Sequence, residues 1–129
     1  MAETGLYQIK LVVGRVGTPG APILHIQGTV ESATGIVNAM AEITQAVPPP
    51  DGDIKILHVL GRVRHTGFGK DDIFVTLNGR YLAPEPPGVI AVHYLPFDAF
   101  LKVDKSWNGT GSYGYGKHHV EDVPVKSES

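Results

Sequence analysis

The stretch LYQIKLVVGRV, residues 6–16, decides the fold class, because its apolar residues recur at every second position. One parity is apolar and the other begins with polar residues: Tyr7, Ile9, Leu11 and Val13 against Gln8 and Lys10. Side chains alternate between the two faces of a β-strand, whereas a helix repeats every 3.6 residues. The pattern therefore predicts a strand with one face toward a core.

The same two-residue period recurs along the chain. In residues 22–31 the apolar parity is Leu24, Ile26 and Val30, opposed by His25, Gln27 and Thr29. In residues 99–107 it is Ala99, Leu101, Val103 and Trp107, opposed by Lys102, Asp104 and Ser106. In residues 72–82 it is Ile73, Val75 and Leu77, and the following Asn78-Gly79 predicts a tight hairpin turn. The β-branched and aromatic residues of 88–95 predict a further strand.

Two segments leave alternatives open. Residues 54–63 are apolar on both parities at first, which predicts a strand buried on both sides or one in a closed barrel. Residues 34–47 fit a helix with Ile36, Met40, Ile43 and Val47 on one face. They also fit a strand with Val37, Ala39, Ala41 and Ile43 on one face, and the alternating neighbours favour the strand.

Clusters of glycine and proline separate these segments and predict turns: residues 17–22, 48–53, 66–72, 78–80, 83–88 and 108–111. Connections long enough to join parallel strands are missing. The sequence therefore predicts an all-β fold of about eight strands, an antiparallel barrel or sandwich with at most one short helix. We expect a single β domain over residues 6–125, with flexible ends at 1–5 and 126–129.

The composition excludes several kinds of function. A net charge of −2 gives no basic field for nucleic acid, and the absence of cysteine removes disulfides, thiolate catalysis and cysteine-bound zinc. No apolar run has the length of a membrane span, and the first residues have no signal-peptide pattern. We therefore expect a soluble, cytoplasmic protein, although export without a signal peptide leaves no mark in a sequence.

The stretch SWNGTGSYGYGKHH, residues 106–119, formally matches two nucleotide-binding motifs. Residues 109–114 fit G-x-G-x-x-G and residues 111–117 fit G-x-x-x-x-G-K. Both motifs need a helix after the loop, and His118 stands where the second needs Ser or Thr. We interpret Asn108-Gly109 as a turn and the following residues, through 123, as one returning strand, with no nucleotide cofactor.

Several stretches resemble a small proteobacterial family that is described only as a domain of unknown function. They are QGTV (27–30), VNAMAEITQA (37–46), PPP (48–50), LGRVRHTG (60–67) and SWNGTGSYGYG (106–116). The resemblance spans most of residues 6–120 and implies a bacterial, soluble, β-rich protein. The last stretch is also similar to the W-x-G-x-Y-x-G texture of barrels such as the avidins. This chain has a single tryptophan, so biotin is not implied.

Six histidines are the remaining candidates for chemistry. Adjacent His118 and His119 point to opposite faces of a strand and cannot chelate one ion together, so we predict no metal site. His25, His58 and His93 each lie within a predicted strand. They either face outward separately, which we favour, or converge in a lumen together with Glu42 or Arg62. The candidate ligand-binding residues are His25, Glu42, His58, Arg62, His93, Trp107 and Tyr113.

Function remains a choice among three hypotheses. The sequence favours a non-enzymatic β-domain that binds a small ligand or a protein partner, because no catalytic constellation or cofactor motif is present. The first alternative is a small barrel enzyme of isomerase or cyclase type that uses interior histidines. The second is a homo-oligomeric structural or surface component that associates through an exposed apolar face of its sheet.

Overall fold

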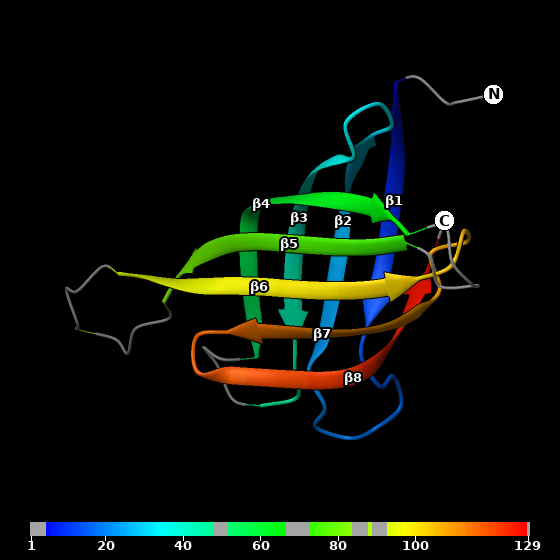
Figure 1. Cartoon of the computed structure of the whole chain (residues 1–129). Helices are drawn as coiled ribbons and strands as arrows, with labels where there is room; N and C mark the ends of the chain where they lie inside the picture. Colours follow the sequence, from blue (N-terminus) through cyan, green and yellow to red (C-terminus); the bar gives the residue numbers. More distant parts are fainter. Residues whose placement is uncertain (1–4, 48–51, 67–72, 84–87, 89–92, 129) are drawn as a thin grey trace.

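The computed structural model of the chain is a closed antiparallel β-barrel, described for residues 5–47, 52–66, 73–83, 88 and 93–128 (Figure 1). Its strands are β1 (Leu6–Val13), β2 (Ile23–Glu31), β3 (Ile36–Thr44), β4 (Asp53–His65), β5 (Ile73–Leu82), β6 (Tyr94–Val103), β7 (Gly109–Tyr115) and β8 (His118–Ser127). Each strand pairs with its neighbours in sequence, and β8 returns to β1. The described residues include no helix, and so none with the length and apolar character to cross a membrane.

Most of the alternating apolar residues point into the barrel as the sequence predicts, whereas Tyr7, on the same parity of β1, is 37% exposed. Leu11, Ile26 and Leu101 are each at most 1% exposed, and the inward positions of all eight strands form one cluster. The described residues include no buried polar or charged side chain, so the interior is an apolar core. Burying such side chains is the dominant favourable contribution to folding. The two-residue period therefore selects the fold, and the barrel replaces the sandwich alternative.

The ambiguous segment 34–47 is a strand, as favoured. In β3 the inward residues are Val37, Ala39, Ala41 and Ile43, while Met40 points outward. A helix would have placed Met40 in the core. A bulge between Ala39 and Ala41 shifts the register against β4, so Ala39 pairs with Val59 and Ala41 with Ile56. Both Leu57 and His58 therefore point outward in β4.

The prediction that residues 54–63 are buried on both sides is wrong, whereas the closed barrel offered with it is confirmed. Leu57 and Leu60 are 59% and 60% exposed. The bulge explains the pattern, because an extra residue in one strand changes which parity faces the core. Figure 1 shows β4 bending so that it pairs with β3 along one part and with β5 along another. The apolar residues on the outer side of β4 therefore belong to the surface of the protein and not to its core.

The predicted hairpin turn at Asn78-Gly79 is also wrong. Both residues lie inside β5, where Asn78 pairs with Leu60 and Asp98 on its two sides. Neither residue has the positive φ that a type I′ turn needs. The continuous ladder between β5 and β6 overrides the local turn propensity. Half of the strand predicted at 88–95, residues 89–92, lies outside the described residues, and β6 begins at Tyr94.

The glycine-rich stretch forms two strands and not one. β7 ends at Tyr115, and the chain turns at Gly116, whose φ of 60° favours glycine, before β8 begins. Gly111 faces the core, where an added Cβ would lie 2.6 Å from a methyl carbon of Leu101 and 3.1 Å from one of Val125. The absence of a side chain at Gly111 therefore leaves room for the core side chains Leu101 and Val125.

The preceding turn comes earlier than the predicted Asn108-Gly109. β6 ends at Val103, and the turn runs through Asp104–Asn108, while Gly109 already belongs to β7. The Asp104 carboxylate accepts hydrogen bonds from the backbone N–H of Ser106, at 2.8 Å, and of Asn108, at 3.1 Å. Trp107 therefore lies in the turn and not on the face of a strand, yet it is buried against the end of the barrel.

The barrel closes over a short ladder. β8 pairs with β1 only from Leu11 to Val13, opposite Val125–Ser127, whereas the other neighbouring strands pair over longer stretches. β8 continues to Ser127, two residues past the boundary expected for the domain. The N-terminal half of β1 extends beyond this seam (Figure 1).

Candidate functional site

The histidines do not converge inside the barrel. His58 and His93 are exposed, and His25 lies half-buried on the outer side of β2. The interior contains apolar side chains, so a ligand site lined by interior histidines has no place among the described residues. The favoured expectation, separate histidines that face outward, agrees with this arrangement. Candidate binding surfaces therefore lie on the outer face of the barrel.

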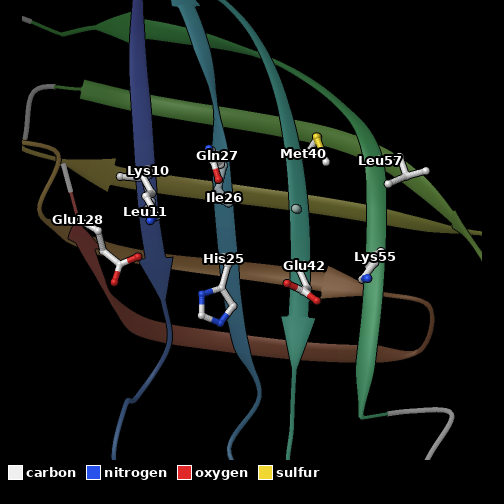
Figure 2. Close-up of a pocket in the computed structure, with 11 residues that line it drawn as sticks. Lys10, Leu11, His25, Ile26, Gln27, Met40, Glu42, Lys55, Leu57 and Glu128 are labelled. Carbon is white, nitrogen blue, oxygen red and sulfur yellow. The ribbon is translucent and has the colours of Figure 1, made fainter.

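A groove runs over the outer surface of β1 to β4, with a volume of about 370 Å³ (Figure 2). The strand register explains how its side chains come together, because outward residues on neighbouring strands form rows. One row contains Lys10, Gln27, Met40 and Leu57, and a second contains His25, Glu42 and Lys55, with Glu128 beside β1. The groove is thus a product of the pairing and not of a local motif.

The first row ends in an exposed apolar pair. Met40 and Leu57 are 57% and 59% exposed, and they lie on neighbouring strands at the bulge. Leu60, 60% exposed, follows on the same side of β4. Isolated apolar residues on a surface need no explanation, but adjacent ones rimmed by polar groups are typical of interaction sites. Met40 and Leu57 point outward by the ordinary alternation of their strands. The bulge places Leu57 and His58 together opposite Met40 and changes the parity of β4, so that Leu60 points outward as well.

The second row carries both signs of charge. The His25 ring Nε2 lies 3.2 Å from Thr44 Oγ1, and Glu42 is the cross-strand neighbour of both His25 and Lys55. A side-chain hydrogen bond with Asp53 raises the pKa of Glu42, and the negative charge of Asp53 acts in the same direction. Lys55 and His25 oppose this shift. The neighbouring carboxyl group of Asp53 therefore favours the protonated form of Glu42.

The structure brings together only some of the predicted binding residues. His25 and Glu42 are adjacent, and His58 lies one residue beyond the groove residue Leu57. Arg62 pairs with Ile36, six residues along β3 from Glu42, which is about 20 Å at the rise of a strand. Arg62 is therefore remote from His25 and Glu42 and does not join them.

The two aromatic candidates lie elsewhere. Tyr113 is a core residue of β7, and its hydroxyl donates a hydrogen bond to the Pro22 carbonyl at 3.1 Å. Burial, and to a smaller extent Tyr115, raises the pKa of Tyr113. Trp107 packs edge-on against Tyr7, with ring centroids 6.3 Å apart. Neither residue contributes to the groove.

Met40, Leu57 and Lys55 were not predicted as site residues. The signal is present in residues 54–63, where apolar residues occupy both parities, but this pattern equally fits burial on both sides or a strand in a closed barrel. The bulge, which changes the parity of β4 after Leu57, has no signature in this sequence. Within the described residues, no group of three or more His, Cys, Asp or Glu side chains has the arrangement of a metal site.

Comparison with protein families identifies the relationship of the chain. The model of the family described as "Domain of unknown function (DUF1842)" matches residues 4–119, which include β1 to β7 and the first residues of β8. The chain belongs to this family. The predicted membership in a family of unknown function is thereby confirmed, whereas its bacterial origin stays a prediction. A comparison with curated proteins finds no match.

Proposed function

We propose that this chain is a non-enzymatic binding domain that recognises a protein partner through the outer groove of β1 to β4. The observation that carries the proposal is the exposed pair Met40 and Leu57, adjacent on the sheet and flanked by a row of opposite charges. Interfaces commonly combine an apolar centre with a polar, charged rim. Glu42 and Lys55 supply that rim, and His25 extends it.

A protein partner fits the groove better than a small ligand does. Small-molecule pockets enclose most of the ligand surface, whereas this groove lies on the outer side of a sheet and leaves one side of any occupant in solvent. A broad partner surface covers such a groove entirely. The apolar pair would then be buried by a complementary side chain, and the charged row would fix orientation.

The experiment places a photo-crosslinking amino acid at Leu57 and, as a control, at Lys117 in the turn between β7 and β8. We expect one reproducible protein adduct from position 57 and none from position 117. The purified partner should bind the wild type and lose affinity at least about tenfold when Leu57→Lys is introduced. Because Leu57 is exposed, this substitution should leave the unfolding midpoint nearly unchanged.

Three outcomes would overturn the proposal. The first is identical adducts, or none, at both positions. The second is an identified partner that binds Leu57→Lys as well as the wild type. The third is a metabolite that raises the melting temperature of the wild type but not of a Glu42→Gln variant, which would identify a small-ligand site instead. Light scattering that shows a dimer dissolved by Leu57→Lys would make the partner a second copy of this chain.

A further inference from the structure

The seam between β1 and β8 offers a second binding site, distinct from the groove. Backbone groups of β1 alternate between its two sides. The Gly5 carbonyl accepts a hydrogen bond from Ser32 beside β2, whereas the Lys10 carbonyl and the Gly14 N–H bond to the β8 side, at Glu128 and Pro124. Even-numbered residues of β1 therefore point their N–H and C=O groups toward the seam.

β8 satisfies only part of this edge. Its ladder covers Leu11–Val13, and the Glu128 N–H extends it by one bond to Lys10. By the same alternation, Gln8 and Leu6 direct their backbone groups to the same side. In the described part of the chain, no strand pairs with them there. β1 is therefore a paired strand in its second half and an open edge from Leu6 to Ile9.

The opposite open edge, in the first half of β8, is protected. The Arg15 guanidinium from the loop after β1 donates to the Asp122 carbonyl at 3.0 Å. Asp122 has a φ of 50°, which interrupts the regular strand, and Pro124 has no N–H to offer. Coverage, irregularity and proline are the means by which proteins protect exposed edges. Residues 6–9 contain no proline, no charge and no bulge.

A hollow lies directly beside this unprotected edge. It has a volume of about 420 Å³, and its lining includes Tyr7, Gln8 and Ile9 from β1 and Trp107 and Asn108 from the turn after β6. Trp107 has a φ of 65°, a conformation that is unfavourable for a bulky residue and persists only where its surroundings enforce it. The turn thus holds an aromatic ring next to an open strand edge.

We infer that the edge of β1 at Leu6–Ile9 binds an extended segment of a partner polypeptide as an added antiparallel strand, with one of its side chains in the hollow beside Trp107. Backbone hydrogen bonds from Leu6 and Gln8 give the affinity, and the hollow gives the selectivity. A second copy of this chain fits less well. Pairing through four residues on each side buries far less than the roughly 1,200 Å² of a stable interface.

The test uses a display library of random linear peptides, selected on the whole protein, with affinities of the selected peptides then measured by fluorescence anisotropy. Gln8→Pro removes the backbone N–H of Gln8, which points toward the seam. No hydrogen bond to β2 is lost, because the backbone groups of Gln8 point away from β2. Gln8→Ala keeps the backbone donor and is the matched control. We expect peptides that bind the wild type and Gln8→Ala, and bind Gln8→Pro about tenfold more weakly.

Equal binding to Gln8→Pro, or failure to select any peptide, would overturn the inference. If Gln8→Pro does not fold, amide exchange on the wild type replaces it. The N–H groups of Leu6 and Gln8 should become slow when the selected peptide is added, and unchanged exchange would refute an added strand. If the wild type forms dimers and both Gln8→Ala and Gln8→Pro abolish them, the edge of β1 binds a second copy of this chain, which would also count against a peptide occupant. Either proposal can fail alone, because the first depends on the side chains of Met40 and Leu57 and the second on backbone groups of Leu6 and Gln8.

Discussion

Truncation of two adjacent residues on β6 tests the barrel interior, because the structure places their side chains on opposite faces. Leu101 is 0% exposed, whereas Phe100 is 46% exposed. Leu101→Ala should lower the free energy of unfolding by about 3–5 kcal/mol, which combines the lost transfer free energy with the cost of a cavity in a close-packed core. Leu101 is fully buried within the apolar cluster, so little collapse is available to reduce this cost.

Phe100→Ala removes the larger side chain but should cost less. About half of the Phe100 surface already faces solvent, so only about half of its transfer free energy, about 1 kcal/mol, is lost. Its edge-on contact with Phe74, with centroids 5.7 Å apart, adds about 0.5–1 kcal/mol. The expected cost is therefore about 1–2 kcal/mol, below that of the smaller Leu101.

Urea denaturation followed by circular dichroism measures both costs, and unchanged m-values would show that the two states keep their compactness. If Leu101→Ala does not fold, Leu101→Val provides a milder version, with an expected cost of about 1 kcal/mol. A Phe100→Ala variant that is less stable than Leu101→Ala would refute the assignment of faces along β6.

Three further variants test other parts of the structure. Gly111→Ala should lower stability by about 1–3 kcal/mol in urea denaturation, because its Cβ would crowd the core, and a neutral result would contradict the packing at that position. Glu42 has a raised pKa in the folded state, so its protonated form stabilises the fold at low pH, and this contribution is lost as pH rises through the folded pKa. Glu42→Gln should therefore raise the melting temperature at neutral pH by an amount worth less than about 1 kcal/mol, since solvent screens the carboxyl group, and should give no gain at acid pH. Asp104→Ala should cost about 1–2 kcal/mol and shift Trp107 fluorescence to the red, because the turn loses two backbone hydrogen bonds, and an unshifted spectrum would oppose this account.

The fold was predictable because it depends on a property that every strand repeats. Residues such as Leu11 and Ile26 are apolar at alternate positions, and only a sheet buries such a set on one side. The errors arose where a local preference competed with the ladder. Asn78-Gly79 has strong turn propensity, but pairing on both sides holds it in β5. Barrel closure between β1 and β8 is a long-range contact that no local pattern reveals.

The candidate site was predictable only in part. His25 and Glu42 were identified as polar residues within strands, and the register makes them neighbours. Met40 and Leu57 were missed because apolar residues in a strand are normally assigned to the core. Both face outward by the alternation of their strands, and the bulge opposite Met40 also turns Leu60 outward, so that apolar residues of both parities of β4 reach the surface. A leucine at the surface and a leucine in the core look alike in a sequence, so only the structure distinguishes them.

Amide hydrogen exchange within β1, measured by NMR on the free protein, tests the central claim that the barrel closes over only part of this strand. Val12 and Gln8 point their N–H groups to the same side of β1, but only Val12 faces a residue of β8, Lys126. The account predicts slow exchange at Val12 and fast exchange at Gln8. Fast exchange at Val12 would show that the barrel is open, and protection at Gln8 equal to that at Val12 would show that the edge is already occupied.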